Sequence, residues 1–226
     1  TLLQSRSGLH LHLLTPPTPA EQHELIRAGG VDLVYANPFD ASELIRQLGF
    51  SAFARPVNKA DEMVIACSAK STATRVEDLR AGCRIAVTDN RDVRLIGLRL
   101  LEAADLTDAD IQWVPTDTFQ GCARLAIKGE VDAAFFMADT FHALSRITRS
   151  QLTVLVESAL ADITHVLLAH AKVADQVPTL LAALAGIGSI PADQEVLDAL
   201  GISGGFAPMQ QEESEFMLDL METLLD

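Results

Sequence analysis

The first residues whose spacing could support chemistry are two histidines near the start of the chain. His10 and His12 are two residues apart, so on a strand both side chains would share one face and could hold a metal ion. A metal site needs at least one more protein ligand, and no third candidate lies near them in the sequence. We therefore expect no metal site and no cofactor.

Catalytic and nucleotide-binding motifs are absent from the sequence. It contains no phosphate loop, no G-x-G-x-x-G turn, no H-E-x-x-H pair and no G-x-S-x-G nucleophile turn. The segment Gly201-Ile202-Ser203-Gly204-Gly205 resembles the last motif only superficially, because it follows a predicted helix where the motif needs a strand. We interpret it as a turn and expect a binding protein. An enzyme on the same fold, such as a small-molecule lyase or dehydratase, is the least favoured alternative.

Charge and composition exclude several kinds of partner. The 226 residues carry a formal net charge of −14, which disfavours nucleic acid and anionic lipid as partners. A small anionic ligand stays possible, because the local charge of a site can oppose the global charge. Hydrophobic residues make up 49% and aromatic residues only 5%, so the cores must be aliphatic. The three cysteines form no C-x-x-C pair, which favours buried structural thiols.

No apolar run is long enough for a transmembrane helix, and no signal peptide is visible. The first eight residues read as the end of a helix stopped by Gly8. We expect residues upstream of this numbering in the full protein.

Short apolar runs alternate with amphipathic stretches along the sequence, and these segments predict the strands and helices that must position any site. Strands are predicted at 9–14, 31–36, 50–57, 63–68, 84–88, 111–114, 131–137, 152–156 and 163–170. Helices are predicted at 18–28, 40–48, 74–81, 89–104, 119–128, from about 140, and at 177–184, 192–200 and 212–225. This alternation is typical of βαβ units and parallel sheets.

One segment recurs 100 residues later. Gly29–Ala36 resembles Gly129–Phe136, since each has a glycine helix stop, Val-Asp, an apolar strand and a loop into a helix. Ligands of open α/β sheets bind beyond the carboxyl ends of the strands. With one copy in each lobe, Tyr35–Asn37 and Met137–Thr140 are expected to face a shared cleft.

Four segments together resemble a known family, the phosphate, phosphite and phosphonate substrate-binding proteins of ABC transporters, which have the type II periplasmic-binding fold. The resemblance covers nearly the whole chain and rests on the order and spacing of the segments. They are Gly30–Pro38, Glu77–Ala86, Leu125–Ala134 and Leu200–Pro208. The family fold begins with one more strand and helix than this chain shows.

The resemblance also indicates where the site departs from the family. Family members carry Ser-x-Ser at a helix N-terminus, where hydroxyl and N–H groups hold the oxyanion. This chain has Asp89-Asn90-Arg91-Asp92-Val93-Arg94 there. Either Arg91 or Arg94 replaces the hydroxyls with a bidentate grip, or both are exposed first-turn residues. The ligand is then a different anion, or a zwitterion that meets Asp61 and Arg91 together.

These observations predict a two-lobed α/β protein of the type II periplasmic-binding class, with a mostly parallel sheet in each lobe and a ligand cleft between the lobes. Lobe 1 is predicted at 1–62 with 160–226 and lobe 2 at 63–159, with hinges near 57–63 and 157–163. The residues expected to bind the ligand are Tyr35, Asn37, Asp61, Thr88, Asp89, Asn90, Arg91, Arg94, Thr118, Gln120 and Asp139.

The expected function is capture of a small anionic solute by hinge closure, in the periplasm, for an ABC permease or a membrane sensor. A cytoplasmic regulatory or sensory domain with the same fold and a degenerate site is the main alternative. No nucleic acid partner and no direct membrane insertion are expected.

Overall fold

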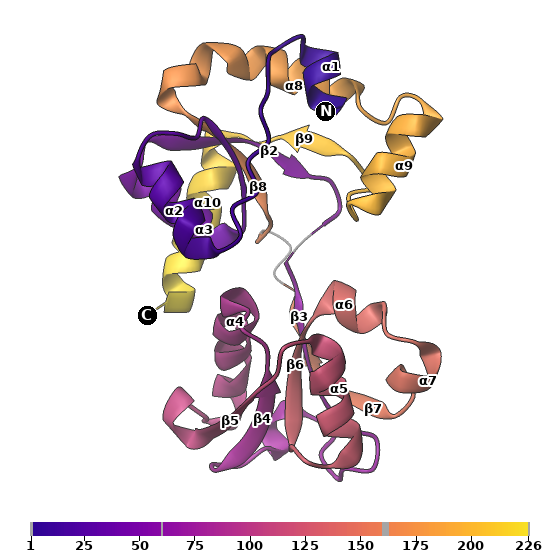
Figure 1. The fold of residues 1–226 in the computed structure, drawn as a ribbon. Helices are drawn as coiled ribbons and strands as arrows, with labels where there is room; N and C mark the ends of the chain where they lie inside the picture. Colours follow the sequence, from indigo (N-terminus) through magenta and orange to yellow (C-terminus); the bar gives the residue numbers. More distant parts are fainter. Residues whose placement is uncertain (1, 60, 160–162, 226) are drawn as a thin grey trace. The chain divides into compact units, whose positions relative to one another are not determined.

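The computed structural model describes residues 2–59, 61–159 and 163–225 of the chain. The chain divides into two compact units, Thr1–Ala60 with Asp162–Glu222 and Asp61–Ala161 with Thr223–Asp226. Each unit has its own sheet flanked by helices, as Figure 1 shows. The α/β class with two sheets is therefore confirmed.

Unit 1 consists of a four-stranded sheet and the helices around it. The strands of this sheet A are β1 (Leu33–Ala36), β2 (Phe50–Pro56), β8 (Val166–His170) and β9 (Phe206–Pro208). The α-helices are α1 (Leu2–Ser7), α2 (Pro19–Arg27), α3 (Pro38–Gln47), α8 (Val177–Gly186), α9 (Pro191–Ala199) and α10 (Gln211–Leu225), of which the residues up to Glu222 belong to this unit. A 3₁₀ segment lies at Ala171–Gln176.

The strand directions in sheet A differ from the expected mostly parallel arrangement. The order is β1-β8-β2-β9, and each of the three ladders is antiparallel. β1 and β2 do run in the same direction, joined by α3 as a βαβ unit, but β8 lies between them and runs the opposite way. The apolar runs in the sequence show that these strands are buried, and burial carries no information about direction.

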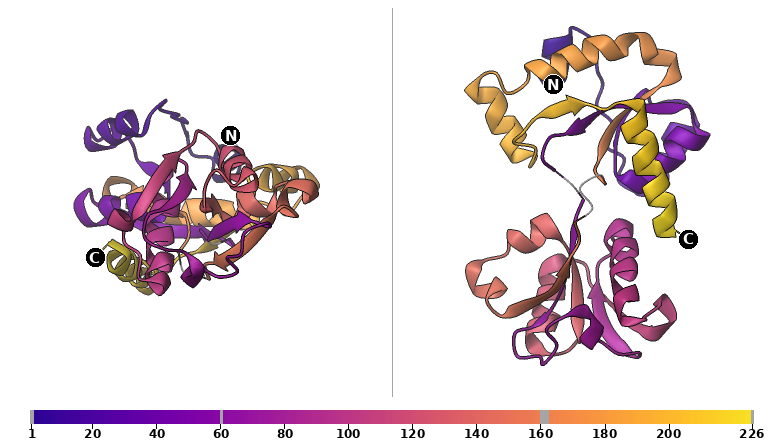
Figure 2. Two further views of the ribbon diagram at one scale, coloured as in Figure 1. Left: turned by 90° about the horizontal axis from the view of Figure 1, so that it is seen from below. Right: turned by 180° about the vertical axis from the view of Figure 1, so that it is seen from behind.

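Helices cover both faces of sheet A (Figure 1, Figure 2). On one face Leu180 and Leu184 of α8 pack with Phe53 and Ala169, and α1 lies beside α8. α3 packs against β1, β2 and β8 through Phe39, Ala41 and Leu44, which are all buried. The sheet is thus a central layer between helices on its two faces.

The strand expected at 9–14 is wrong. Residues 8–16 have no regular secondary structure, and the amides of Leu9 and Leu11 are bonded to the side chains of Ser7 and Gln4 instead of a neighbouring strand. Leu13 is 71% exposed. An alternating pattern makes a strand only where a partner supplies the ladder bonds, and no described strand does so here.

Unit 2 is built around a five-stranded sheet, sheet B. Its strands are β3 (Met63–Ser68), β4 (Cys83–Val87), β5 (Ile111–Pro115), β6 (Ala133–Met137) and β7 (Leu152–Glu157). Its α-helices are α4 (Arg91–Leu101), α5 (Phe119–Lys128), α6 (Ala138–His142) and α7 (Arg146–Arg149). Short 3₁₀ turns lie at Val76–Asp78, Glu102–Ala104 and Asp108–Asp110. The helix expected at 74–81 is reduced to the first of these turns.

Sheet B is mixed, in the order β5-β4-β6-β3-β7. β4 runs parallel to β5 and to β6, whereas β3 is antiparallel to β6 and β7. The chain leaves β4 for β5 on one side and returns to β6 on the other. This reversal is the topological switch point at which open α/β sheets bind ligands.

The two faces of sheet B carry separate cores. Val93 and Ile96 of α4 pack with Phe135 on one face, and Cys122 and Ala126 of α5 belong to the core on the other. The expected buried thiols are confirmed, since all three cysteines are free and buried. α4 and α5 therefore start from the same edge of the sheet and run along opposite faces.

No single helix among the described residues is both long and apolar enough to cross a membrane. Two consecutive helical segments, Ala171–Gly186 and Pro191–Ala199, pass that test only when they are counted as one segment, and they are bent by 103° relative to each other.

Candidate functional site

The register of sheet B brings one end of each of its five strands to the same edge. Met63, the first residue of β3, pairs with Met137, the last residue of β6. Because β4 and β5 run parallel to β6, their last residues, Val87 and Pro115, lie at this same edge. The chain enters unit 2 just before Met63 and leaves it just after Glu157 of β7, which pairs with Val64. We call this the crossing edge of sheet B.

Two full-length helices begin at the crossing edge of sheet B, and each is capped by a side chain. Asn90 Oδ1 accepts the amide of Val93 at the start of α4, at 2.9 Å. Thr118 Oγ1 accepts the amide of Gly121 at the start of α5, at 3.1 Å. Caps of this kind satisfy one amide each and leave the earlier first-turn N–H groups pointing outward. This edge therefore has the positive end of two helix dipoles and is suited to an anion.

Hydroxyl groups lie beside these helix starts. Thr88 follows β4, and its Oγ1 is buried without a hydrogen-bond partner among the described residues. A buried hydroxyl without a partner costs free energy, so a ligand atom that bonded it would recover that loss. Thr116 follows β5, and its Oγ1 bonds Thr118 O at 3.1 Å and lies 3.0 Å from Cys122 Sγ.

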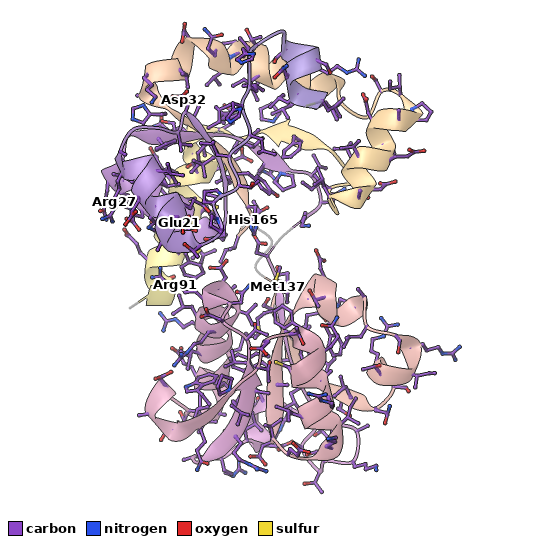
Figure 3. All side chains as sticks on the ribbon, viewed as in Figure 1. Glu21, Arg27, Asp32, Arg91, Met137 and His165 are labelled. Carbon is purple, nitrogen blue, oxygen red and sulfur yellow. The ribbon has the colours of Figure 1, made fainter. Side chains whose placement is uncertain are left out.

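The two arginines expected at α4 differ in their surroundings. Arg94 Nη2 donates to Asp108 Oδ1 at 2.7 Å, and its guanidinium lies 4.6 Å from the centre of the Trp113 ring. Arg94 is thus held along β5. Arg91, the first residue of α4, is exposed and is labelled at the end of the helix in Figure 3. Of the two, Arg91 has the position from which an anion at the crossing edge could be reached.

The other residues expected in unit 2 also lie at or next to the crossing edge. Asp89 precedes the cap of α4, Gln120 is in the first turn of α5, and Asp139 is in the first turn of α6, all with exposed side chains. Asp61 is 8% exposed and precedes β3. The carboxylates of Asp89 and Asp139 would disfavour a dianion held close to them and favour a ligand that also carries an amine.

Sheet A has a crossing edge of its own. β1 and β2 end there and β8 and β9 begin there, because Ala36 pairs with Val166 and Pro56 pairs with Phe206. Three aromatic rings gather at this edge. The Tyr35 ring centre lies 5.3 Å from that of His165 and 6.3 Å from that of Phe206. Tyr35 is 42% exposed, so this edge offers an aromatic surface as well as polar groups.

Asn37 has a structural role that the sequence reasoning did not assign to it. Its Oδ1 accepts the amide of Asp40 at 2.8 Å, and its Nδ2 donates to Asp40 Oδ2 at 2.8 Å. Asn37 is therefore the N-cap of α3, and the Asp40 carboxylate lies in the first turn, where an external anion would otherwise be stabilised. Unit 1 is thus less suited than unit 2 to hold the charged group of an anion.

No group of three or more potential metal ligands occurs among the residues that the structure describes. His10 and His12 are both exposed and lie in the irregular segment before α2.

Comparison with known proteins agrees with this architecture. A family model described as "ABC transporter, phosphonate, periplasmic substrate-binding protein" matches residues 1–214. The chain belongs to this family. Its members are substrate-binding proteins, which places the chain among binding proteins and not among enzymes. A search of curated proteins found no match.

Solved structures of the family and of related binding proteins share the fold at low sequence identity. A binding-protein component of a phosphonate transporter from Pseudomonas aeruginosa superposes with a TM-score of 0.75 at 16% identity, over 98% of this chain and 78% of that one. PhnD1 from Prochlorococcus marinus, solved with methylphosphonate, gives 0.76 at 12% identity, over 99% and 89%. The aliphatic sulphonate-binding protein SsuA of Escherichia coli gives 0.67 at 18%, over 98% and 80%.

Sequence reasoning missed several residues of the two crossing edges. Thr116 stands directly after a predicted strand, so the rule that strand ends meet could have identified it. His165 and Phe206 begin their strands, and they belong to the edge only because β8 and β9 run antiparallel to β2. Strand direction is not readable from the residues, so no local signal identified these two.

Proposed function

We propose that this substrate-binding family member captures a small organic oxyanion, phosphonate- or sulfonate-like, between the crossing edges of its two units, which act as the two lobes. The observation that carries the proposal is that each sheet presents its polar and aromatic residues at the edge from which the chain crosses to the other unit. Two full-length helix starts in unit 2 would hold the oxyanion, and the aromatic edge of unit 1 would cover its organic part.

The ligand would be enclosed by rotation about the two chain crossings, near residues 57–63 and 157–163. The closed form would be the one recognised by an ABC permease, in the periplasm. The names of the similar structures support an oxyanion as ligand, since they include a methylphosphonate complex and a sulphonate-binding protein. Asp89 and Asp139 support a ligand with an additional amine over a simple dianion.

A thermal-shift screen tests the proposal. The probes are methylphosphonate, an aminoalkyl phosphonate, a short alkyl sulfonate, inorganic phosphate, acetate and an amino acid. A true ligand at 100 times its dissociation constant adds about 2.7 kcal/mol to the free energy of unfolding. The proposal fails if no phosphonate or sulfonate stabilises the protein, and selective stabilisation by the amino acid would move the ligand to another class.

The Thr88 hydroxyl gives the first test of the site itself. Thr88→Val keeps the side-chain shape and removes the group that lacks a partner among the described residues. Because a hydrogen bond to a charged group contributes about 1.5–3 kcal/mol, we expect the dissociation constant to rise about tenfold or more. Fluorescence of Trp113, the single tryptophan, measures binding. Thr153→Val, on strand β7, is the matched control and should leave the affinity unchanged.

A further inference from the structure

Two buried hydroxyl groups lie where the chain crosses between the units. Ser158 follows β7 and is 6% exposed, and Thr164 precedes β8 and is 2% exposed. Both belong to the second crossing, and both hydroxyls bond residues of the first crossing, about 100 positions earlier in the sequence. Neither residue is among those expected to bind the ligand.

Ser158 ties the two crossings together inside unit 2. Its Oγ accepts the amide of Met63 at 2.9 Å and donates to the carboxylate of Glu62. Its own amide donates to Met63 O at 2.9 Å. The amide of Ser158 and its hydroxyl, which both donates and accepts, thus all bond to Glu62 and Met63 at the start of β3.

The same cluster reaches the candidate site. The carbonyl of Glu62 accepts the amide of Ala138, the first residue of α6, at 2.9 Å. Glu62 therefore connects Ser158 to the end of β6, where Met137 lies at the crossing edge (Figure 3). A displacement of the first crossing would move the start of α6 with it.

Thr164 makes the corresponding connection inside unit 1. Its Oγ1 donates to Lys59 O at 2.8 Å, and also lies 3.2 Å from His165 O. Lys59 is fixed in turn, because its Nζ donates to Gly201 O at 3.1 Å. The first crossing is also held two residues before Lys59, because the amide of Val57 donates to Gly205 O at 2.9 Å.

We propose that Ser158 and Thr164 are hydroxyl clamps that hold the two crossings together, one clamp in each unit, so that both crossings move as a pair when the units reorient. A two-strand hinge whose strands are clamped at both ends turns about a defined axis, whereas two independent strands allow twisting and shear. Ser158 is in addition a positioning residue, because it fixes the start of α6 through Glu62. The reason for the motion, enclosure of a ligand, rests on the proposed function. The hydrogen bonds that form the clamps do not depend on it.

Hydrogen exchange of the ligand-free protein tests the clamps. Ser158→Ala should accelerate exchange at the amides of Met63 and Ala138, each by about fivefold or more, since a net hydrogen bond of about 1 kcal/mol is lost. Ser150→Ala, which removes an exposed serine hydroxyl of unit 2, is the control and should leave both amides unchanged. Unchanged exchange at both amides in Ser158→Ala would overturn the positioning role.

Variants of Glu62 keep the test valid if Ser158→Ala does not fold. Glu62→Gln retains an acceptor for the Ser158 hydroxyl and should behave as the unmodified protein, while Glu62→Ala should show the faster exchange at Met63. Equal exchange in Glu62→Gln and Glu62→Ala would contradict the clamp.

The paired motion is tested by X-ray scattering of the ligand-free protein. Thr164→Val and Ser158→Ala should broaden the distribution of interatomic distances relative to Thr179→Val, a surface threonine of unit 1. A distribution unchanged in both clamp variants would overturn the hinge role. None of these measurements uses a ligand, so a failed ligand screen would count against the proposed function and leave the clamps standing.

Discussion

Close packing at single positions fixes how the helices of unit 2 approach their sheet. Gly97 of α4 faces Phe135 of β6 so closely that a Cβ at position 97 would lie 2.2 Å from the ring. Phe135 is fully buried and also contacts the Trp113 ring edge-on, at 5.6 Å between ring centres. A ring surrounded in this way cannot move aside, so α4 depends on the absence of a side chain at this position to start at the crossing edge.

Gly97→Ala should therefore destabilise the protein. Overpacking of this kind costs about 1–3 kcal/mol, to be measured as a lower midpoint of urea unfolding. Gly186→Ala, at the end of α8, is the matched control, because nothing lies within 4 Å of the added methyl group. It should leave stability unchanged or raise it slightly. Equal effects of the two substitutions would show that Phe135 does yield.

At the scale of elements, the residues that cap the helix starts stabilise the helices and also lie where the ligand is proposed to bind. α3, α4 and α5 are each capped by a side chain, from Asn37, Asn90 and Thr118. In unit 2 the caps leave earlier first-turn amides without an intrahelical acceptor, and the proposed oxyanion would bond to these amides. In unit 1 the Asp40 carboxylate already lies at the helix start, so the start of α3 is less suited to an anion.

Asn37→Ala should weaken α3 by about 1 kcal/mol, the usual cost of losing such a cap. Ser42→Ala, within the same helix, is the control and should not reduce stability. Urea unfolding measures both variants. A change in ligand affinity for Asn37→Ala without a change in stability would instead assign Asn37 directly to the binding site.

Two short 3₁₀ turns of unit 2 make its stability depend on pH. The amide of Thr74 is the main cause that lowers the pKa of Asp78, and the hydroxyl of Thr107 is the main cause that lowers the pKa of Asp110. A carboxyl group whose pKa is lowered by folding stabilises the protein above its unfolded pKa of about 4 and loses that contribution as the pH falls through the folded value.

The melting temperature should therefore fall as the pH drops from about 5 through the folded pKa values of these groups. The double variant Asp78→Asn and Asp110→Asn should be less stable at pH 7 and should lose less on acidification. Thermal unfolding between pH 7 and pH 3 measures the difference. Identical pH profiles for the variant and the unmodified protein would exclude a contribution from these turns.

At the scale of the whole molecule, two separately built α/β units are connected by two crossings, and in each sheet the candidate residues lie at the strand ends next to these crossings. The proposed function uses this organisation, since the two units would reorient about the crossings to enclose a solute. The net charge of −14 would not oppose the proposed anionic ligand, because the starts of α4 and α5 carry the positive ends of their helix dipoles.

Saturation with methylphosphonate, or with the strongest ligand found in the screen, should reduce the radius of gyration in solution. Lobe closure around the ligand is the physical reason, and small-angle X-ray scattering is the measurement. Thr88→Val at the same ligand concentration should show a smaller decrease. Binding without any compaction would indicate a site within unit 2 alone.

The sequence by itself determined the α/β class, most strands and helices, the absence of catalytic motifs and the family. These properties depend on local periodicity, on capping residues such as Thr18 and Thr118, and on short segments such as Gly30–Pro38. The candidate residues after β4, β5 and β6 could be anticipated because parallel strands end at a common edge.

Only the tertiary structure decided the direction of β8, the missing ladder at residues 9–14 and the hydrogen-bond partners of Ser158 and Thr164. Each of these depends on partners far away in the sequence, such as Met63 for Ser158. A hydrophobic pattern shows that a residue is buried, but the free energy that selects a strand direction or a hydroxyl partner comes from groups brought together only by folding.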